Sequence, residues 1–287
     1  MKTTDLSFEI AEITFRYIYA SEIEISDDAT IHNFLISKQE KYDVINHVEI
    51  CKNLVEECIV DEEPAFKAPA WTLYDSFVIF HPNGEVIAKM EFSGEFTNLK
   101  TLIKDLSFSK QPLPICITGF LLQRILIKKK RGFIMHGAVI RVNNEAFVLT
   151  GNSGVGKSTL SSIISNTIEC ERISDDRYII VKKGNKYFAY GNPFDTKAER
   201  NLNKGVEIKS IFFLHHSLEN GFEKVKEEMI MKKMFTVSML PYWKKELLYW
   251  SISVLKQLTN QLNVVDLYFK PSKEIVYYMI ENRLLVV

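Results

Sequence analysis

The chain has 287 residues, 46% of them apolar, which is enough to build one large hydrophobic core or two smaller ones. Lysine and arginine number 36, as do aspartate and glutamate, so the net charge is zero and no nucleic-acid partner is indicated. No apolar run reaches membrane-spanning length, and the N-terminus lacks the apolar stretch of a signal peptide. The four cysteines form no C-x-x-C pair, which argues against a disulfide framework or a zinc site. We therefore expect a cytoplasmic protein with no membrane partner. Its oligomeric state stays open.

Residues 1–113 carry no catalytic motif and are predicted to form an accessory region of α+β type. Short β-rich runs occur over 8–20, 71–81 and 85–92. The last two flank Pro82-Asn83-Gly84, and Asn-Gly is a strong hairpin signal. The stretch 43–58 is compatible with either a short helix or a strand.

A second region, residues 114–287, begins with helical spacing of apolar residues over 115–130. The helix ends in a basic run, Lys128–Arg131, and the glycine that follows, Gly132, is predicted to stop it. The basic run is expected to be a solvated face, with a substrate-docking patch as the alternative.

Residues Gly151–Ser158 fit the phosphate-binding pattern G-x-x-x-x-G-K-[ST] at every fixed position. Glycines let the backbone curl so that successive N–H groups point at phosphate oxygens. Lys157 is expected to reach the β- and γ-phosphates, and the Ser158 hydroxyl to bind Mg²⁺. An apolar strand over 145–150 precedes the pattern, and a helix over 158–165 follows it with its positive end toward the anion. The sequence thus predicts an ATP–Mg²⁺ site with these nucleotide-binding residues: Gly151, Asn152, Ser153, Gly154, Val155, Gly156, Lys157, Ser158 and Thr159.

The strand that enters the phosphate loop is predicted to have an antiparallel neighbour. Residues 133–142 are β-rich, and Asn143-Asn144 reads as a tight turn between the two runs. His136 lies at the far end of that neighbour, so pairing across the hairpin brings it near the loop. An active-site role and a purely structural one both remain open for this histidine.

Two adjacent carboxylates, Asp175 and Asp176, follow a short strand after the phosphate-loop helix. One is able to hold Mg²⁺ while the other accepts a proton from an attacking hydroxyl. The alternative is an ordinary polar turn. Further along, we expect a hairpin over 178–190, a polar loop over 191–200 and a buried strand over 208–215. Two helices over 227–240 and 244–259 follow, then a strand over 263–269 and a final strand or helix over 275–279.

Taken together, these residues resemble the catalytic domain of HPr kinase/phosphorylase, and more closely the HPr-kinase-like proteins associated with peptide natural-product gene clusters. The resemblance rests on His136-Gly137, the phosphate loop and Ser174-Asp175-Asp176. It extends to Pro193-Phe194-Asp195-Thr196-Lys197, which is similar to a P-W-x-G-K segment of those proteins, and covers roughly residues 115–287.

The resemblance implies an α/β fold with a mixed sheet, shared with phosphoenolpyruvate carboxykinases. It implies that Asp175 accepts the proton, Asp176 and Ser158 hold the metal, and His136 lies against Asp175 and the phosphate. Lys197 is the implied contact to the transferred phosphate. The bifunctional enzymes also have a metal-binding Glu, for which this chain offers only Glu199 or Glu207, so phosphorolysis is in doubt.

The predicted function is an ATP–Mg²⁺-dependent kinase that transfers the γ-phosphate to a serine hydroxyl of a peptide or protein substrate. Two alternatives remain: a kinase for a small hydroxylated metabolite, and a nucleotide-binding regulator without transfer activity. The paired carboxylates argue against the regulator, because a module that only binds nucleotide needs no base.

Overall fold

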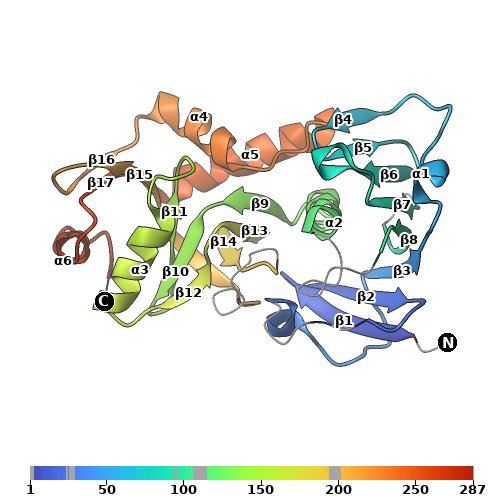
Figure 1. Ribbon diagram of the computed structural model, residues 1–287. Helices are drawn as coiled ribbons and strands as arrows, with labels where there is room; N and C mark the ends of the chain where they lie inside the picture. The colour runs from blue at the N-terminus through green and yellow to red at the C-terminus, as the bar shows by residue number, and fades with distance from the viewer. Residues whose placement is uncertain are drawn as a thin grey trace. The chain divides into compact units, whose positions relative to one another are not determined.

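The computed structural model describes residues 3–23, 25, 30–93, 96–105, 115–193 and 202–286. The chain divides into two compact units, Met1–Ile125 and Leu126–Val287 (Figure 1). Helix α2, Ile115–Lys128, spans this division, so the first unit includes most of a helix that the sequence analysis assigned to the second region.

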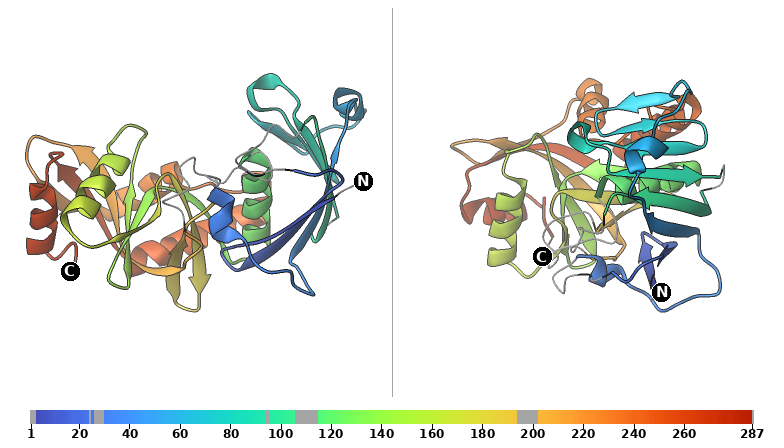
Figure 2. Two further views of the ribbon diagram at one scale, coloured as in Figure 1. Left: turned by 60° about the horizontal axis from the view of Figure 1, so that its bottom comes forward. Right: turned by 45° about the vertical axis from the view of Figure 1, so that its right-hand side comes forward.

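The first unit is built on a mixed sheet with strand order β1-β2-β3-β8-β7-β6-β5-β4 over its described residues. In Figure 2 these strands form a curved sheet with α2 against one face. The Phe120 ring of α2 packs edge-on against Trp71 and Phe80 of that sheet. The strands are β1 Thr4–Ile10, β2 Ile13–Tyr19, β3 Val44–Ile50, β4 Phe66–Ala68, β5 Trp71–Leu73, β6 Phe77–Phe80, β7 Ala88–Phe92 and β8 Asn98–Ile103.

Local turn chemistry explains several of these strands. The β-rich run 8–20 belongs to a hairpin, β1–β2, whose turn residues Ala11 and Glu12 both have positive φ. The stretch 43–58 contains both a strand, β3, and a single-turn helix, α1 (Leu54–Glu57). The hairpin predicted across Pro82–Gly84 is confirmed: β6 pairs antiparallel with β7, and the intervening 3₁₀ turn holds Asn83 at φ 59°.

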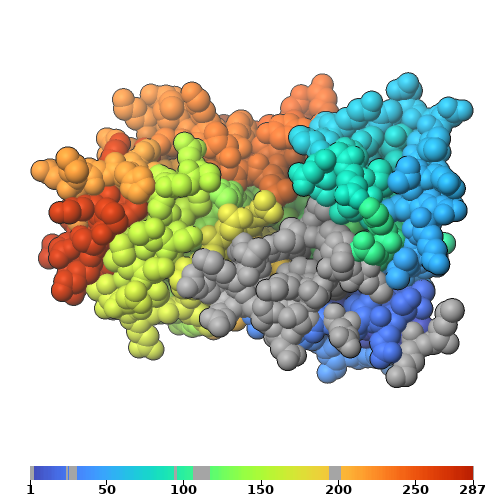
Figure 3. All heavy atoms as spheres, viewed as in Figure 1, coloured from blue at the N-terminus to red at the C-terminus, as the bar shows by residue number. Residues whose placement is uncertain are grey.

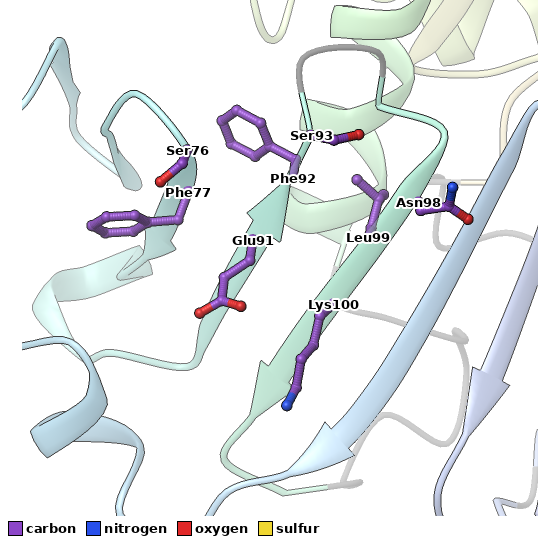
Figure 4. A pocket seen from close by; sticks show the side chains of 8 residues that line it. All are labelled: Ser76, Phe77, Glu91, Phe92, Ser93, Asn98, Leu99 and Lys100. Carbon is purple, nitrogen blue, oxygen red and sulfur yellow. The ribbon is translucent and has the colours of Figure 1, made fainter.

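A hollow of about 530 Å³ lies between the ends of β6, β7 and β8 in the first unit (Figure 4). Phe77 and Phe92 give it apolar walls, and Glu91 and Lys100 extend from neighbouring strands. Lys100 also forms an ion pair with Glu49, at 3.1 Å. The lining residues are Ser76, Phe77, Glu91, Phe92, Ser93, Asn98, Leu99 and Lys100.

The second unit is a three-layer α/β/α arrangement around a mixed sheet, with path β12-β10-β11-β15-β14-β13-β9 and with β17 beside β15. One face is covered by α3 and α6, whose Leu160, Ile164 and Met279 join the apolar core of that side. The other face is covered by α4 and α5. The elements are β9 Gly132–His136, β10 Ala138–Val142, β11 Glu145–Thr150, α3 Lys157–Thr167, β12 Glu171–Ser174, β13 Arg177–Lys183, β14 Lys186–Tyr190, β15 Val206–His216, β16 Gly221–Lys224, α4 Glu227–Val237, α5 Lys245–Gln261, β17 Asn263–Phe269 and α6 Glu274–Glu281.

The predicted hairpin around Asn143-Asn144 is confirmed, since β10 pairs antiparallel with β11. The β-rich run 133–142, however, is two strands that break at Gly137. β9 pairs with β13 and β10 pairs with β12, so two chain segments bend together, one at Gly137 and the other at Asp175–Asp176. The Gly137 N–H donates to the Asp176 carbonyl at 2.8 Å across this corner. Sheet pairing alone therefore places His136 and the two aspartates at one bend.

Two expectations about helices need adjustment. Gly132 does not end α2. Lys130 takes the left-handed conformation, φ 50°, and the N–H groups of Lys130 and Arg131 donate to the carbonyls of Ile127 and Leu126. Gly132 instead begins β9, where a Cβ would lie 1.8 Å from the Ile180 carbonyl oxygen. The last element, left open between strand and helix, is helix α6.

Within the described ranges, no helix is long and apolar enough to cross a membrane.

Candidate active site around the phosphate loop

The phosphate loop connects β11 to α3 at the carboxyl ends of the parallel strands β11, β15 and β17. Three of its glycines have positive φ: Gly151 at 138°, Gly154 at 79° and Gly156 at 94°. A Cβ on Gly156 would lie 2.8 Å from Cζ of Phe269. Both this close contact and the positive φ therefore exclude a side chain at this position. Asn152, Ser153 and Gly154 are exposed. The segment that carries the loop and α3, yellow-green in Figure 3, reaches the surface of the molecule.

Lys157 is the first residue of α3, and its side chain folds back over the loop. Its Nζ donates to the carbonyl oxygens of Gly151 at 3.1 Å and Asn152 at 3.0 Å. The residue is only 8% exposed. Burial lowers the pKa of Lys157, with the nearby Asp176 carboxylate acting in the opposite direction. The ammonium group is thus held inside the curve of the loop, where phosphate oxygens would meet it.

His136 lies next to the loop, as the hairpin predicts. Its carbonyl accepts a hydrogen bond from Thr150 Oγ1 at 2.6 Å, at the point where β11 enters the loop. Its Nδ1 lies 3.3 Å from Oδ1 of Asp176. Burial lowers the pKa of His136, the Lys157 ammonium adds to this, and Asp176 opposes it. The imidazole is therefore favoured in its neutral form, which is able to accept a proton.

The two aspartates have different partners, and this corrects one expectation. The resemblance places His136 against Asp175, whereas in the structure the imidazole lies beside the carboxylate of Asp176. The Asp175 carboxylate is 8% exposed and lies 2.5 Å from Nη2 of Arg172, whose Nη1 is 3.4 Å from the Ser162 hydroxyl of α3. The Asp176 side chain is 47% exposed. The corner therefore directs one carboxylate toward the phosphate loop and the other toward a buried guanidinium.

The remaining predicted residues divide into three groups. Ser158 and Thr159 are exposed in the first turn of α3. Lys197 and most of its segment, residues 194–200, lie outside the described residues, as does Glu199. Glu207 is not at the site. It lies opposite Glu145 in the register of β15 with β11, at the end of β11 that is remote from the loop, and its side chain forms an ion pair with Lys186 at 2.7 Å.

Two residues of this region were missed from the sequence, Arg172 and His216. Nothing local marks Arg172, because its partner becomes adjacent only through the bend after β12. His216 carried a usable signal, since it ends a buried strand and ligands in α/β proteins bind outside the carboxyl ends of such strands. Its Nε2 lies 3.3 Å from the Gly154 carbonyl oxygen.

The donor set fits a magnesium–nucleotide complex. The Ser158 hydroxyl and the Asp176 carboxylate are hard oxygen donors beside the loop, and Mg²⁺ is usually held by one or two such groups together with substrate phosphates. The described part of the chain gathers no group of three or more His, Cys, Asp or Glu residues suited to a metal ion. Backbone N–H groups of the loop and the Lys157 ammonium supply what the phosphates require.

Comparison with known proteins gives a distant likeness among solved structures. No protein-family model matches the chain, and no curated protein matches it. Among solved structures, the HPr(Ser) kinase/phosphatase from Coxiella burnetii is similar at 12% identity, over 53% of this chain and 95% of that one, with a TM-score of 0.30. A TM-score of this size does not establish a shared fold, so a function for this chain has to come from its own residues.

Proposed function

We propose that the protein is a phosphotransferase that uses a magnesium-bound nucleoside triphosphate, with ATP as the expected donor. The observation that carries the proposal is the phosphate loop with Lys157 folded inside it and the His136–Asp176 pair beside it. A loop that only bound nucleotide would have no use for a neutral imidazole in contact with a carboxylate at its reactive end.

In the proposed reaction, the acceptor hydroxyl oxygen bonds to the γ-phosphorus as the bond from that phosphorus to the β,γ-bridging oxygen breaks. The nucleoside diphosphate leaves with the bridging electrons, and the hydroxyl proton passes to the neutral imidazole of His136, which lies against the Asp176 carboxylate. Lys157 and the loop N–H groups stabilise charge on the phosphates. Bound Mg²⁺, held by Ser158 and Asp176, would supply further charge neutralisation.

The assignment of the proton acceptor differs from the one implied by the sequence resemblance. That resemblance gives the role to Asp175. We propose that Asp175 instead positions the corner through its ion pair with Arg172, because its carboxylate is buried against that guanidinium. Asp176 and His136 are the groups close to Lys157.

We further propose that the acceptor is a serine hydroxyl of a peptide or protein. This rests on the sequence motifs alone, and the first unit would be the region that recognises the acceptor. A small hydroxylated metabolite remains the competing acceptor. The competing function is nucleotide binding without phosphate transfer.

The test is transfer of labelled γ-phosphate from ATP–Mg²⁺ to serine peptides, proteins and hydroxylated metabolites. We expect transfer by the parent and none by Lys157→Ala. His136→Ala should lower turnover while the thermal transition and ATP affinity stay close to those of the parent. A parent that binds ATP but transfers phosphate to no acceptor in a broad screen would refute the phosphotransferase and favour a regulator.

A further inference from the structure

An exposed aromatic ring lies beside the phosphate loop, on the side away from the reactive groups. His216, the last residue of β15, stacks on the buried ring of Phe269, with centroids 5.6 Å apart and planes 29° apart. Its Cε1 would lie 3.3 Å from a Cβ on Gly156, and its Nε2 is 3.3 Å from the Gly154 carbonyl oxygen. One face of the imidazole is thus supported by Phe269, while the residue as a whole is exposed.

The sheet gives a direction to a bound polyphosphate. β11, which leads into the loop, lies between β10 and β15. The corner with His136 and Asp176 is on the β10 side, and His216 is on the β15 side. If the terminal phosphate lies at Lys157 and that corner, the rest of the donor extends toward the carboxyl ends of β15 and β17. This is the general location of ligands in α/β sheets.

We propose that His216 is the stacking platform for the nucleobase of the phosphate donor. This inference rests on the proposed function and narrows it: the donor is a nucleoside triphosphate, and an inorganic polyphosphate lacks the group that this subsite recognises. An aromatic ring fixed on one face by Phe269 loses little freedom when a base stacks on the other face. Lys270 follows Phe269 and is exposed, so a cation lies on the same edge as the platform.

The alternative role for His216 is support of the loop through the Gly154 carbonyl. The two roles predict different ligand dependence, because inorganic triphosphate has the same three phosphates as ATP and no base. Calorimetric titration with both ligands, each with Mg²⁺, separates them. We expect His216→Ala to weaken ATP binding by about fivefold or more, the lower end of what one base–aromatic stack contributes, and to leave triphosphate binding unchanged.

Two variants sharpen the test. His216→Phe keeps a ring but removes the contact with Gly154, so it should keep the preference for ATP over triphosphate. His215→Ala is the matched control, since His215 points to the opposite face of β15 and lies 2.6 Å from Oδ1 of Asp266. It should leave the ratio of the two affinities unchanged.

The outcomes distinguish this inference from the proposed function. The nucleobase platform is wrong if His216→Ala binds ATP as tightly as the parent, or if its affinities for ATP and for triphosphate fall by the same factor. In either case the phosphotransferase proposal stands. If the parent binds neither ligand, both proposals fall.

Discussion

Exchanging the two adjacent aspartates for asparagine, one at a time, should give two different phenotypes. Asp175→Asn is expected to destabilise the second unit, and Asp176→Asn to remove phosphate transfer. The reason is their surroundings: Asp175 lies 2.5 Å from Arg172 with both side chains about nine-tenths buried, whereas Asp176 is half exposed beside His136. The two variants therefore test which of the two aspartates belongs to the reactive groups and which one only positions the corner.

The size of the stability effect follows from the burial of the ion pair. Removing one partner of a buried pair costs about 3–5 kcal/mol, because the other charge is left without compensation. Asparagine still offers an oxygen to Arg172, so we expect about 2–3 kcal/mol for Asp175→Asn. For a unit of this size that corresponds to a transition temperature lower by roughly 5–10 °C. Asp176→Asn should shift the transition by less than about 2 °C, since exposed ion pairs contribute little.

The assay combines thermal unfolding with phosphate transfer at saturating ATP–Mg²⁺. Adding Arg172→Met to Asp175→Asn removes the uncompensated charge, so the double variant should recover part of the lost stability. Folded Asp175→Asn should retain at least about a tenth of parental turnover, while Asp176→Asn loses about 10²-fold or more. The assignment is refuted if Asp175→Asn keeps the stability of the parent but has lost phosphate transfer, while Asp176→Asn stays active. That result would restore Asp175 as the base.

The other predictions concern the loop and the first unit. Lys157→Ala should weaken ATP binding at least about tenfold in calorimetry, because it removes a charge-assisted contact; unchanged affinity would contradict the site. Gly156→Ala should reduce ATP affinity more than Gly154→Ala, since both strain a positive φ but only Gly156 faces Phe269 at 2.8 Å; equal losses would argue against this packing. In the first unit, the hydrogen bond from Arg16, with Lys38 adding to it, holds the pKa of Asp5 at about 2, below its ordinary 3.8. The stability it contributes is present above about pH 4 and is lost as the pH falls through 2. Asp5→Asn should therefore speed hydrogen exchange in β1–β2 by about fivefold at pH 7, after allowance for solvent screening, and by clearly less near pH 2, where about half of the carboxylate is already protonated.

The parts of the site that depend on short-range chemistry were predictable from the sequence. The loop glycines have the positive φ values that their spacing requires, and the Asn143-Asn144 turn brings β10 against β11. That hairpin predicts His136 near the loop, although His136 belongs to β9 and meets Thr150 through the bend at Gly137. The strand and helix that flank the loop also follow from local apolar patterns.

The partners of the aspartates were not predictable, because they depend on a bend that the apolar pattern does not encode. Residues 133–142 read as one strand, and only packing divides them at Gly137. A Cβ there would meet the Leu149 carbonyl oxygen at 3.1 Å and Cε1 of Tyr178 at 3.2 Å. The place of His216 likewise depends on the parallel register of β11 with β15, which shifts by one residue between Ala146 and Phe147. Registers of this kind are set between residues 62 or 63 positions apart in the chain.

The backbone at the corner bears on how substitutions at the site should be interpreted. The Gly137 N–H donates to the Asp176 carbonyl at 2.8 Å, and the Thr150 hydroxyl donates to the His136 carbonyl at 2.6 Å. These bonds fix the main chain of Asp176 to Gly137, next to His136, and the main chain of His136 to Thr150 at the start of the loop. Since these bonds survive a change of side chain, His136→Ala and Asp176→Asn remove chemistry while the corner keeps its shape. Thr150→Val is the substitution that would loosen the corner, because it deletes the hydroxyl and keeps both side chains of the pair.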